Sequence, residues 1–519
     1  MNKNTSIKYF YIIFLITISF SFIIYNGYRG VYPIDSFIVF NGGYNVLNGY
    51  HPFKDYWSIT GPILDYLQAF FFSIFGINWK GYLAHSLFIN IFLSLSSFFL
   101  FSKLGLGYFF SFLYSACIAI LAYPQTGTPF MDHHAFYFSY IAIVFLQAAI
   151  IDNKKIYWFL IPVFLLISFL SKQLPAGYIL IFVLCFFIYY LFFNSEKKYN
   201  MFFGLLTGSV IGISIVIATL YFFKIQINDI VLQYLKYPLS IGEDRIQSSI
   251  FNLKSIFFEY KFIYFSTIII FFYFFKITLE KINEKRQDFD IILINIFLLL
   301  SLIASQILTK NQILIFFLIP HFLAISHYLI KKNNNKKIFQ NLILLMLIFT
   351  TLKYHDRFNY HKKFMELENA NFDISVDAKS FDIRLKGLKW ITPKYIINPD
   401  IELKMLIDSK NIINENSINS ANSIIMTDYQ IFQPFLNFKT VSPLKWYDNM
   451  SIPSAKNPNF QFYKNYVYDN LKRQKIKKVF LLDKTNWMIE DIFDDKSCLI
   501  FKELNQILVE VNIEDCFKS

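Results

Sequence analysis

The sequence is poor in charge and in cysteine. Only 16% of its 519 residues are Asp, Glu, Lys or Arg, and it has four cysteines. A soluble chain of this length carries more charge, so the composition argues against an ordinary soluble protein. Also absent are a hydrolase nucleophile elbow, a phosphate-binding glycine loop and a zinc-protease helix. Without an ATP-binding signature, any energy must arrive in an activated substrate.

Apolar residues make up 55% of the chain, and 20% of its residues are aromatic. Runs of about 18 apolar residues predict spanning helices. The segment 63–75 is shorter and contains Asp65 and Gln68, so it predicts an interfacial helix. No small-residue cleavage site follows the first run, which predicts a retained helix and not a cleaved signal peptide. Eleven spans are expected, at about 9–25, 81–101, 106–123, 135–151, 156–171, 176–193, 201–223, 261–278, 291–308, 312–330 and 338–352.

The lysines predict the orientation of these spans. With Lys3 and Lys8 in the cytoplasm, every short inside loop carries lysine, as the positive-inside rule requires. The net charge of +13 therefore reflects orientation, and no nucleic-acid fold signature accompanies it. We expect a bacterial inner-membrane or plasma-membrane protein with a cytoplasmic N-terminus and no nucleic-acid partner. The external segments are then 26–80, 123–134, 171–175, 224–260, 309–311 and everything after about 352.

The last 165 or so residues are polar and predict a separate external domain, 353–519, beyond a transmembrane domain, 1–352. Strand-like runs at 423–429, 478–483 and 507–511, with an amphipathic helix at 463–476 between the first two, indicate a small α/β domain. The fold class expected is thus an all-α polytopic membrane protein with an external α/β domain. Cys498 and Cys516 are either a disulfide or two unrelated thiols, and the sequence favours neither.

Two aspartates stand out in the first external segment. Asp35 begins a loop that continues to Asp55 and is filled with aromatics, glycines and prolines. A carboxylate there can act as a general base on an acceptor hydroxyl. It can equally cap a helix, because 33–36 (Pro-Ile-Asp-Ser) is typical of a helix start. The residues alone support both interpretations about equally.

The second external segment holds Asp132-His133-His134. Carboxylate and imidazole groups are ligands for a divalent cation, so a metal site is one hypothesis. Their spacing matches no strong metal motif, and adjacent residues on a helix point about 100° apart. The other interpretation is that Asp132 caps the helix expected near Ala135.

Basic groups occur in the third and fourth external segments. Lys172, next to Gln173, can present an ammonium to a lipid phosphate or simply snorkel to the headgroup region. Arg245 can bind the same phosphate with its guanidinium fork, or pair with Glu243 or Asp244. By contrast, three histidines are expected to be packed and not ligands: His85, His321 and His327.

The first external segment resembles that of a known superfamily. After Asp35 it reads GGYNVLNGYHPFKDYWSITGP (42–62). This is similar to the GT-C integral-membrane glycosyltransferases, in particular the protein mannosyltransferase and aminoarabinose transferase-like branch. The resemblance is best over about residues 8–200. It departs from the aminoarabinose branch at Ile59-Thr60, where that branch has an acid and a lysine before a Pro-Pro pair; Asp55 is the candidate substitute.

The resemblance implies an inverting transfer of a sugar from a polyprenyl-phosphate donor to a glycan, lipid or protein acceptor outside the membrane. It implies Asp35 as catalytic base, Asp132 as a second catalytic acid residue, and Lys172 at the lipid phosphate. Gln173, Arg245 and Asp55 are the further expected substrate-binding residues. Two other functions stay open: a lipid-linked glycan transporter or flippase, and a polysaccharide polymerase or ligase. Few charges within the expected spans argue against transport.

Overall fold

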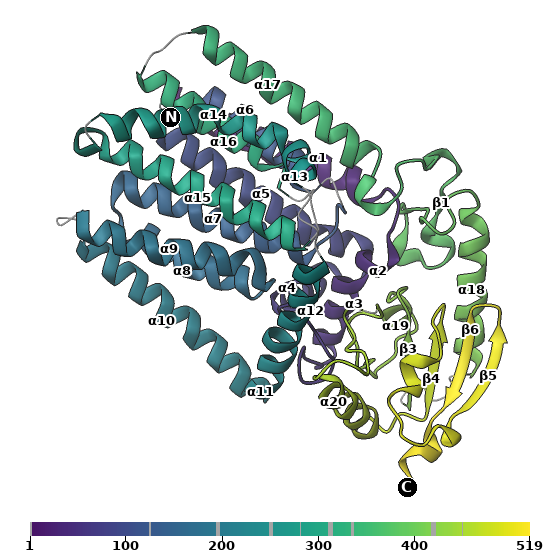
Figure 1. Cartoon of the computed structure of the whole chain (residues 1–519). Coiled ribbons are helices and arrows are strands. Elements are labelled where there is room, and N and C mark those ends of the chain that lie inside the picture. The colour runs from purple at the N-terminus through teal and green to yellow at the C-terminus, as the bar shows by residue number, and fades with distance from the viewer. Residues whose placement is uncertain are drawn as a thin grey trace.

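The computed structural model describes residues 3–123, 126–193, 198–248, 253–280, 282–309, 315–333, 337–416, 422–448 and 450–518. A bundle of long helices occupies one part of the molecule and a small α/β domain the other (Figure 1). The predicted fold class, a helical polytopic membrane protein with an α/β C-terminal region, is confirmed.

Each of the eleven expected spans overlaps a helix among the described residues, and eight of the described helices are long and apolar enough to cross a membrane. Helices of 15 or 16 residues extend only about 23–24 Å, which is less than a bilayer core of about 30 Å. The eight are α1 (Lys3–Gly27), α5 (Trp79–Lys103), α7 (Met131–Asp152), α9 (Gln173–Phe193), α10 (Lys198–Phe223), α14 (Lys261–Leu279), α15 (Arg286–Thr309) and α17 (Lys337–His355). The three shorter ones are α6 (Tyr108–Ala122), α8 (Lys155–Phe169) and α16 (Leu318–Asn333).

The predicted external segments gather at one end of the bundle, beside the α/β domain (Figure 1). Backbone and side-chain hydrogen bonds join them: Gly61 N donates to Ser171 O at 3.1 Å, and Lys54 Nζ to Phe223 O at 3.1 Å. The short helices of this end are α2 (Pro33–Ser36), α3 (Ile38–Leu47), α4 (Ile63–Phe75), α11 (Ile227–Ile230), the π-helix Val231–Lys236 and α12 (Tyr237–Ser248). The lysine-bearing loops lie at the other end, where Lys331 donates to Gly105 O. The alternation of ends agrees with the predicted topology, and which end faces outward stays a prediction.

Two glycines permit the close packing of the first external segment. A Cβ on Gly61 would lie 1.8 Å from the carbonyl oxygen of Leu170, so the segment crosses the end of α8 only without a side chain. A Cβ on Gly42 would lie 2.3 Å from Asp65 Oδ1. Helix α4, where the sequence predicts an interfacial helix, therefore packs directly on α3 with Asp65 fully buried between them.

The C-terminal region contains a four-stranded sheet in the order β3-β4-β6-β5. Strands β3 (Ser423–Met426) and β4 (Lys478–Leu482) are parallel and connected through α20 (Phe460–Arg473), as the strand–helix–strand pattern predicts. Strand β6 (Leu508–Asn512) pairs antiparallel with both β4 and β5 (Ile500–Asn505). Also present are α18 (Pro399–Asn416), α19 (Phe432–Phe435), α21 (Trp487–Glu490) and a ladder of β1 (Val376–Asp377) with β2 (Lys389–Trp390). The sequence analysis did not predict β5 or α18.

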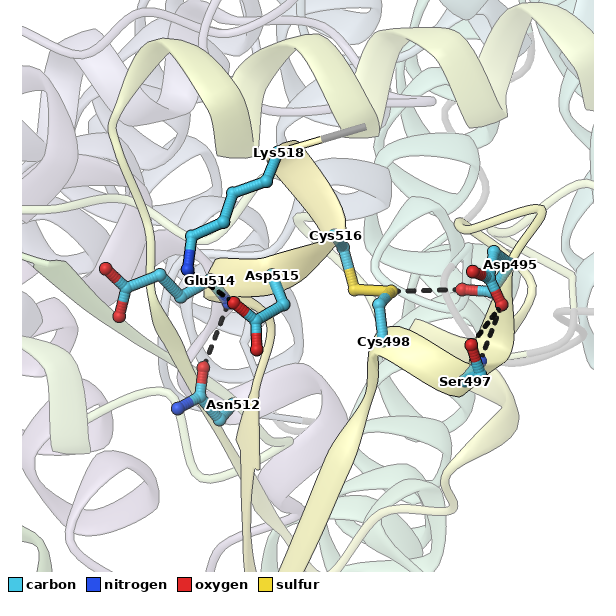
Figure 2. The surroundings of a disulfide bond; sticks show 8 residues. All are labelled: Asp495, Ser497, Cys498, Asn512, Glu514, Asp515, Cys516 and Lys518. Carbon is cyan, nitrogen blue, oxygen red and sulfur yellow. Dashed lines mark hydrogen bonds and ion pairs between the residues drawn. A yellow bond between two sulfur atoms is a disulfide. The ribbon is translucent and has the colours of Figure 1, made fainter.

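A disulfide links the start of β5 to the end of β6. Cys498, just before β5, is bonded to Cys516, after β6, with a Cα–Cα distance of 5.1 Å (Figure 2). Of the two alternatives left open by the sequence, the structure contains the disulfide. The predicted domain boundary at 352/353 falls within α17, which continues to His355.

Candidate functional site

A cavity of about 680 Å³ lies where the external segments converge. Its walls come from α2, the start of α7, the turn between α8 and α9, the π-helix Val231–Lys236 with α12, and Trp446, Asp448, Met450 and Ser451 of the C-terminal region. Four residues selected from the sequence line it together: Asp35, Asp132, Lys172 and Gln173. They come from three segments that are far apart in the chain.

Asp35 lies in the first turn of α2, a four-residue helix that begins at Pro33. Its carboxylate does not cap this helix, and no described residue hydrogen-bonds to it. The side chain is partly accessible from the cavity but surrounded by protein. Burial, and then the negative charge of Asp132, raise the pKa of Asp35 to about 7, while Lys172 opposes the shift. An acid with this pKa is ionised in roughly half of the molecules at neutral pH.

Asp132 and Lys172 form an ion pair beside Asp35. Lys172 Nζ donates to both carboxylate oxygens of Asp132 at 2.7 Å. The Asp132 side chain is 6% exposed and that of Lys172 is 24% exposed, so the ammonium keeps access to the cavity. Helix α7 begins at Met131, so Asp132 lies in its first turn, as the capping interpretation implies. Its carboxylate oxygens accept from Lys172, however, and do not cap the helix. Of the described residues that line the cavity, Lys172 alone carries a positive charge.

The two histidines after Asp132 are not arranged with it as ligands of one metal ion. His134 Nδ1 lies 2.9 Å from Phe130 O, and its Nε2 lies 3.4 Å from Tyr123 OH. His133 is fully buried and stacked on Tyr137. Within the described ranges, no three His, Cys, Asp or Glu side chains are placed to hold one metal ion. The predicted ligand set Asp132-His133-His134 therefore does not fit a divalent cation in this arrangement, and no step below uses one.

Gln173 acts as a bridge between segments. Its Nε2 donates to Ile59 O at 3.0 Å and also to Tyr234 O. It therefore joins the first external segment to the π-helix of the fourth. A second glutamine, Gln233, does the same: its Nε2 donates to Phe53 O at 2.8 Å, and its Oε1 accepts from Ser58 N. The sequence analysis did not select Gln233, because its partners are backbone groups far away in the chain.

Two predicted substrate-binding residues are not among the described residues that line the cavity. Asp55 does not line the cavity: it accepts from His51 N at 2.8 Å and from Arg473 Nη2 of α20 at 2.7 Å. These contacts give it a structural position between the first external segment and the C-terminal region. The side chain of Arg245 falls outside the described part of the structure.

The C-terminal region closes one side of the cavity with Trp446, Asp448, Met450 and Ser451. A fully buried ion pair holds this wall: Lys445 Nζ lies 2.8 and 2.7 Å from the two carboxylate oxygens of Asp65 on α4. Tyr56 OH donates to the same carboxylate at 2.8 Å. Trp57 adds a backbone bond from its N–H to Pro443 O and a side-chain bond to Ser451 O. Nothing in the local sequence marks Lys445 as the partner of Asp65.

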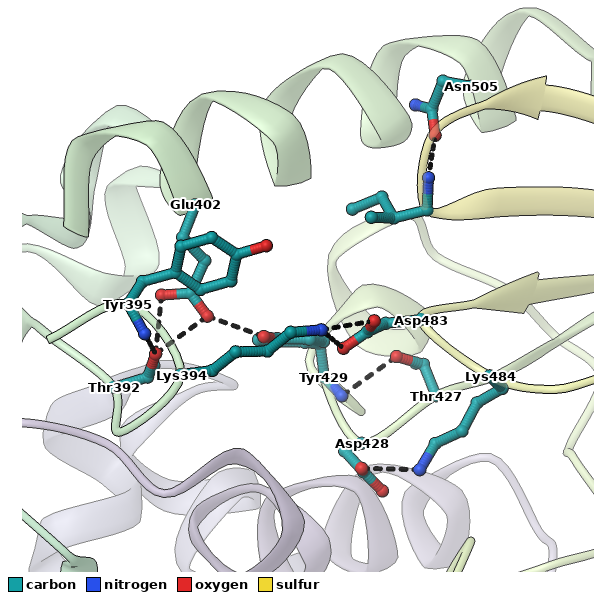
Figure 3. A network of polar contacts seen from close by, with 11 residues as sticks. Thr392, Lys394, Tyr395, Glu402, Thr427, Asp428, Tyr429, Asp483, Lys484 and Asn505 are labelled. Atoms are coloured by element: carbon teal, nitrogen blue, oxygen red, sulfur yellow. Dashed lines mark hydrogen bonds and ion pairs between the residues drawn. The ribbon is translucent and has the colours of Figure 1, made fainter. Parts of the chain in front are cut away.

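Behind this wall, polar side chains stand at the ends of the parallel strands β3 and β4 (Figure 3). Asp428 follows β3 and pairs with Lys484, which follows β4. Glu402 of α18 is buried and accepts from Tyr429 OH at 2.6 Å and from two further side chains. The charge of Asp428 contributes to the raised pKa of Asp35, so this network lies within electrostatic range of the cavity.

Comparisons with known proteins give little. No family model matches the chain, and no curated protein matches it. Among solved structures, the chain is similar to the archaeal oligosaccharyltransferase AglB from Archaeoglobus fulgidus, solved in complex with an inhibitory peptide and a dolichol-phosphate. The two are 11% identical with a TM-score of 0.45, over 92% of this chain and 69% of that one.

Proposed function

We propose that this protein is a GT-C-type glycosyltransferase that transfers a sugar from a polyprenyl-phosphate donor to an acceptor hydroxyl at the outer face of the membrane. One observation carries the proposal: Asp35, Asp132 and Lys172, from three distant segments, line a single cavity. The cavity lies at the end of a helical bundle whose helices are long and apolar enough to cross a bilayer. The resemblance of residues 42–62 to GT-C enzymes supports the same class of reaction.

Asp35 is the proposed general base. Its carboxylate takes the proton of an acceptor hydroxyl as the hydroxyl oxygen attacks the anomeric carbon. The bond from that carbon to the phosphate oxygen breaks, and its electron pair leaves with the lipid phosphate. Attack from the face opposite the leaving group inverts the anomeric configuration. A pKa of about 7 gives Asp35 more basicity than an ordinary carboxylate while leaving much of it ionised at neutral pH.

Lys172 is the proposed partner of the leaving phosphate. Its ammonium has three donors, and Asp132 engages it from one side at 2.7 Å. The remaining donor can face the phosphate as its negative charge grows in the transition state. Asp132 then has two roles that follow from its position: it holds Lys172, and its charge raises the pKa of Asp35.

Apolar side chains form another part of the cavity lining. They include Leu174 and Tyr178 of α9, Leu235 and Leu239 of the fourth external segment, and Leu308 of α15. Leu239 is 66% exposed, as a side chain facing lipid would be. A cavity lined by both charged and apolar side chains suits a substrate with a sugar phosphate head and an isoprenoid tail.

A reconstituted assay tests the proposal. The purified full chain in liposomes would be given polyprenyl-phosphate-linked hexoses and pentoses together with a lipid and glycan extract that supplies acceptor hydroxyls, and free polyprenyl phosphate would be measured. We expect release of the lipid phosphate with at least one donor, and its loss in Asp35→Asn. Unchanged turnover in Asp35→Asn would refute the assignment of the base. If the chain moved intact lipid-linked sugar between leaflets without cleaving it, the transporter alternative would replace the proposal.

A further inference from the structure

A second cavity, of about 660 Å³, lies at the end of α1 and shares no lining residue with the first. Its walls are the last turn of α1 with the two residues after it, the segment 360–373 that follows α17, and Lys389 of β2. The proposed transfer reaction makes no use of it.

Two cations are built into this cavity by backbone pairing. Arg29 forms an isolated parallel bridge with Lys389, in which Lys389 N donates to Tyr28 O at 2.9 Å and Gly30 N to Lys389 O at 3.0 Å. This pairing fixes the backbones of Arg29 and Lys389 side by side, and both side chains line the cavity. No described acidic side chain forms an ion pair with either of them.

Aromatic rings surround the guanidinium of Arg29. Its Cζ lies 4.7 Å from the ring centre of Tyr25, 5.5 Å from that of Tyr360 and 4.4 Å from that of Phe372. Within the described residues, its hydrogen bonds go to neutral oxygens: Tyr25 OH, and two backbone carbonyls at 3.5 Å. A guanidinium has five N–H donors, so part of its capacity is left for a ligand, and its charge lacks a counter-ion.

The remaining charges at this cavity leave it mildly positive. Glu368 is paired with Lys363 at 3.2 Å, so its charge is compensated. Asp373 lines the cavity and, within the described residues, forms no ion pair. Two unpaired cations and one unpaired carboxylate complement a group with one negative charge, such as a phosphodiester. The carboxylate is also available to an amine or a hydroxyl on the same headgroup.

The location identifies the source of such a group. Helix α1 exposes a row of large apolar side chains along its length, including Phe10, Ile13 and Phe20, as expected of a helix that faces lipid. Its apolar span, Thr5–Gly27, is about 35 Å long, so its end reaches the headgroup level. Tyr25 and Tyr360, 38% and 54% exposed, stand there as interfacial tyrosines do. We propose that this cavity binds the phosphodiester headgroup of a membrane phospholipid, with Arg29 and Lys389 on the phosphate.

Native mass spectrometry of the full chain, delipidated in detergent, tests this site. The probes are dioleoyl phosphatidylethanolamine, dioleoyl phosphatidylglycerol and glycerol 3-phosphate, each titrated separately. We expect one tightly bound phospholipid, with at least tenfold weaker binding in Arg29→Gln/Lys389→Gln. Lys456→Gln, an exposed lysine of the same domain, is the matched control and should bind as the wild type does. Comparison of the two lipids shows whether Asp373 selects an amine.

Lys389→Glu is the safer variant, because its side chain is exposed and a loss of folding is not expected. It should weaken phospholipid binding and leave the melting temperature of the lipid-free protein unchanged. Equal binding by the wild type and both variants would overturn the proposal. So would saturation by glycerol 3-phosphate at the same concentration as by the lipids, since that would make the site one for a soluble phosphate. Neither result depends on the glycosyltransferase proposal.

Discussion

The two ends of the helical bundle differ in one carboxylate: the cavity end has paired aspartates, such as Asp132 and Asp65, but also Asp35, to which no described residue is paired. At the end away from the cavity, each of the following has a nearby cation: Asp152 with Lys103, Asp288 with Lys332, and Glu280 with Lys285. At the cavity end, Asp35, Asp132 and Asp448 share a cavity in which, among the described lining residues, Lys172 alone is positive. Paired carboxylates stabilise a structure, whereas a carboxylate without a partner costs stability and is retained for chemistry.

The same contrast appears within the first external segment. Asp65 and Asp35 are both buried enough to have raised pKa values. Asp65 is held by Lys445 and Tyr56, with no exposure to solvent. No described residue makes such contacts with Asp35, which faces the cavity. Both residues are aspartates of the same external segment. The contacts of their carboxylates are therefore what distinguishes the structural Asp65 from Asp35, the candidate base.

The largest expected effect comes from removing the unpaired carboxylate. Asp35→Asn should lower the rate of sugar transfer by about 10³-fold or more, within the range for loss of a general base. Asp152→Asn, at the other end, should change the rate by less than about twofold, because it loses only a partly exposed ion pair. Initial rates of lipid-phosphate release measure both. Similar losses in the two variants would erase the distinction between the ends.

The second-largest effect is expected from breaking the buried clamp, which is the ion pair of Lys445 with Asp65. Lys445→Met leaves the charge of Asp65 buried and unpaired, which should cost about 3–5 kcal/mol of stability. Limited proteolysis should then cut the C-terminal region faster. The double variant Lys445→Met/Asp65→Leu should recover most of the loss, and Lys103→Met should cost about 1 kcal/mol or less. A single variant as stable as the wild type would show that the clamp does not hold the cavity wall.

Lys172→Gln should lower the turnover number by about 10²-fold, because the phosphate loses its cationic partner in the transition state. The affinity for donor should fall less than the turnover number does. Lys332→Gln, which removes a lysine paired to a buried aspartate at the other end, should leave both kinetic constants near those of the wild type. A Lys172→Gln variant with altered affinity only would move this residue from catalysis to binding.

The smallest effect concerns pH. Because Asp35 must be ionised to act as a base, kcat/KM should rise about tenfold per pH unit below its pKa of about 7 and level off above it. In Asp132→Asn a negative neighbour is lost and Lys172 is released, and both changes favour the ionised form of Asp35. The midpoint of the profile should therefore move to lower pH. A shift to higher pH would contradict the assigned electrostatics.

The sequence predicted the parts of the molecule that local pattern controls. Apolar runs located the helices, and strand-like runs found β3, β4 and β6. The packing of His85, His321 and His327 was also predicted: all three are buried and hydrogen-bonded, for example His321 to Asn295 at 2.7 Å. Strand β5 was missed because it is an edge strand with largely exposed residues, so it lacks a buried apolar face.

Pairings between distant segments could not be predicted. Lys445 lies 380 positions from Asp65, and Arg473 lies 418 positions from Asp55, so neither partner is visible in a local window. For this reason Asp55 was expected to bind substrate, whereas in the structure it accepts hydrogen bonds from His51 N and Arg473. Asp35, Asp132 and Lys172 were found because each lay in a predicted external segment. Their roles in catalysis remain predictions.

The most direct test of the central claim is a cryo-EM structure of the full chain in nanodiscs with a polyprenyl monophosphate. The account predicts phosphate density within hydrogen-bonding distance of Lys172 Nζ, the isoprenoid chain along Leu174, Leu239 and Leu308, and Asp35 on the open side of the phosphate. Density for the phosphate at another place, with the cavity between Asp35 and Lys172 empty, would contradict it.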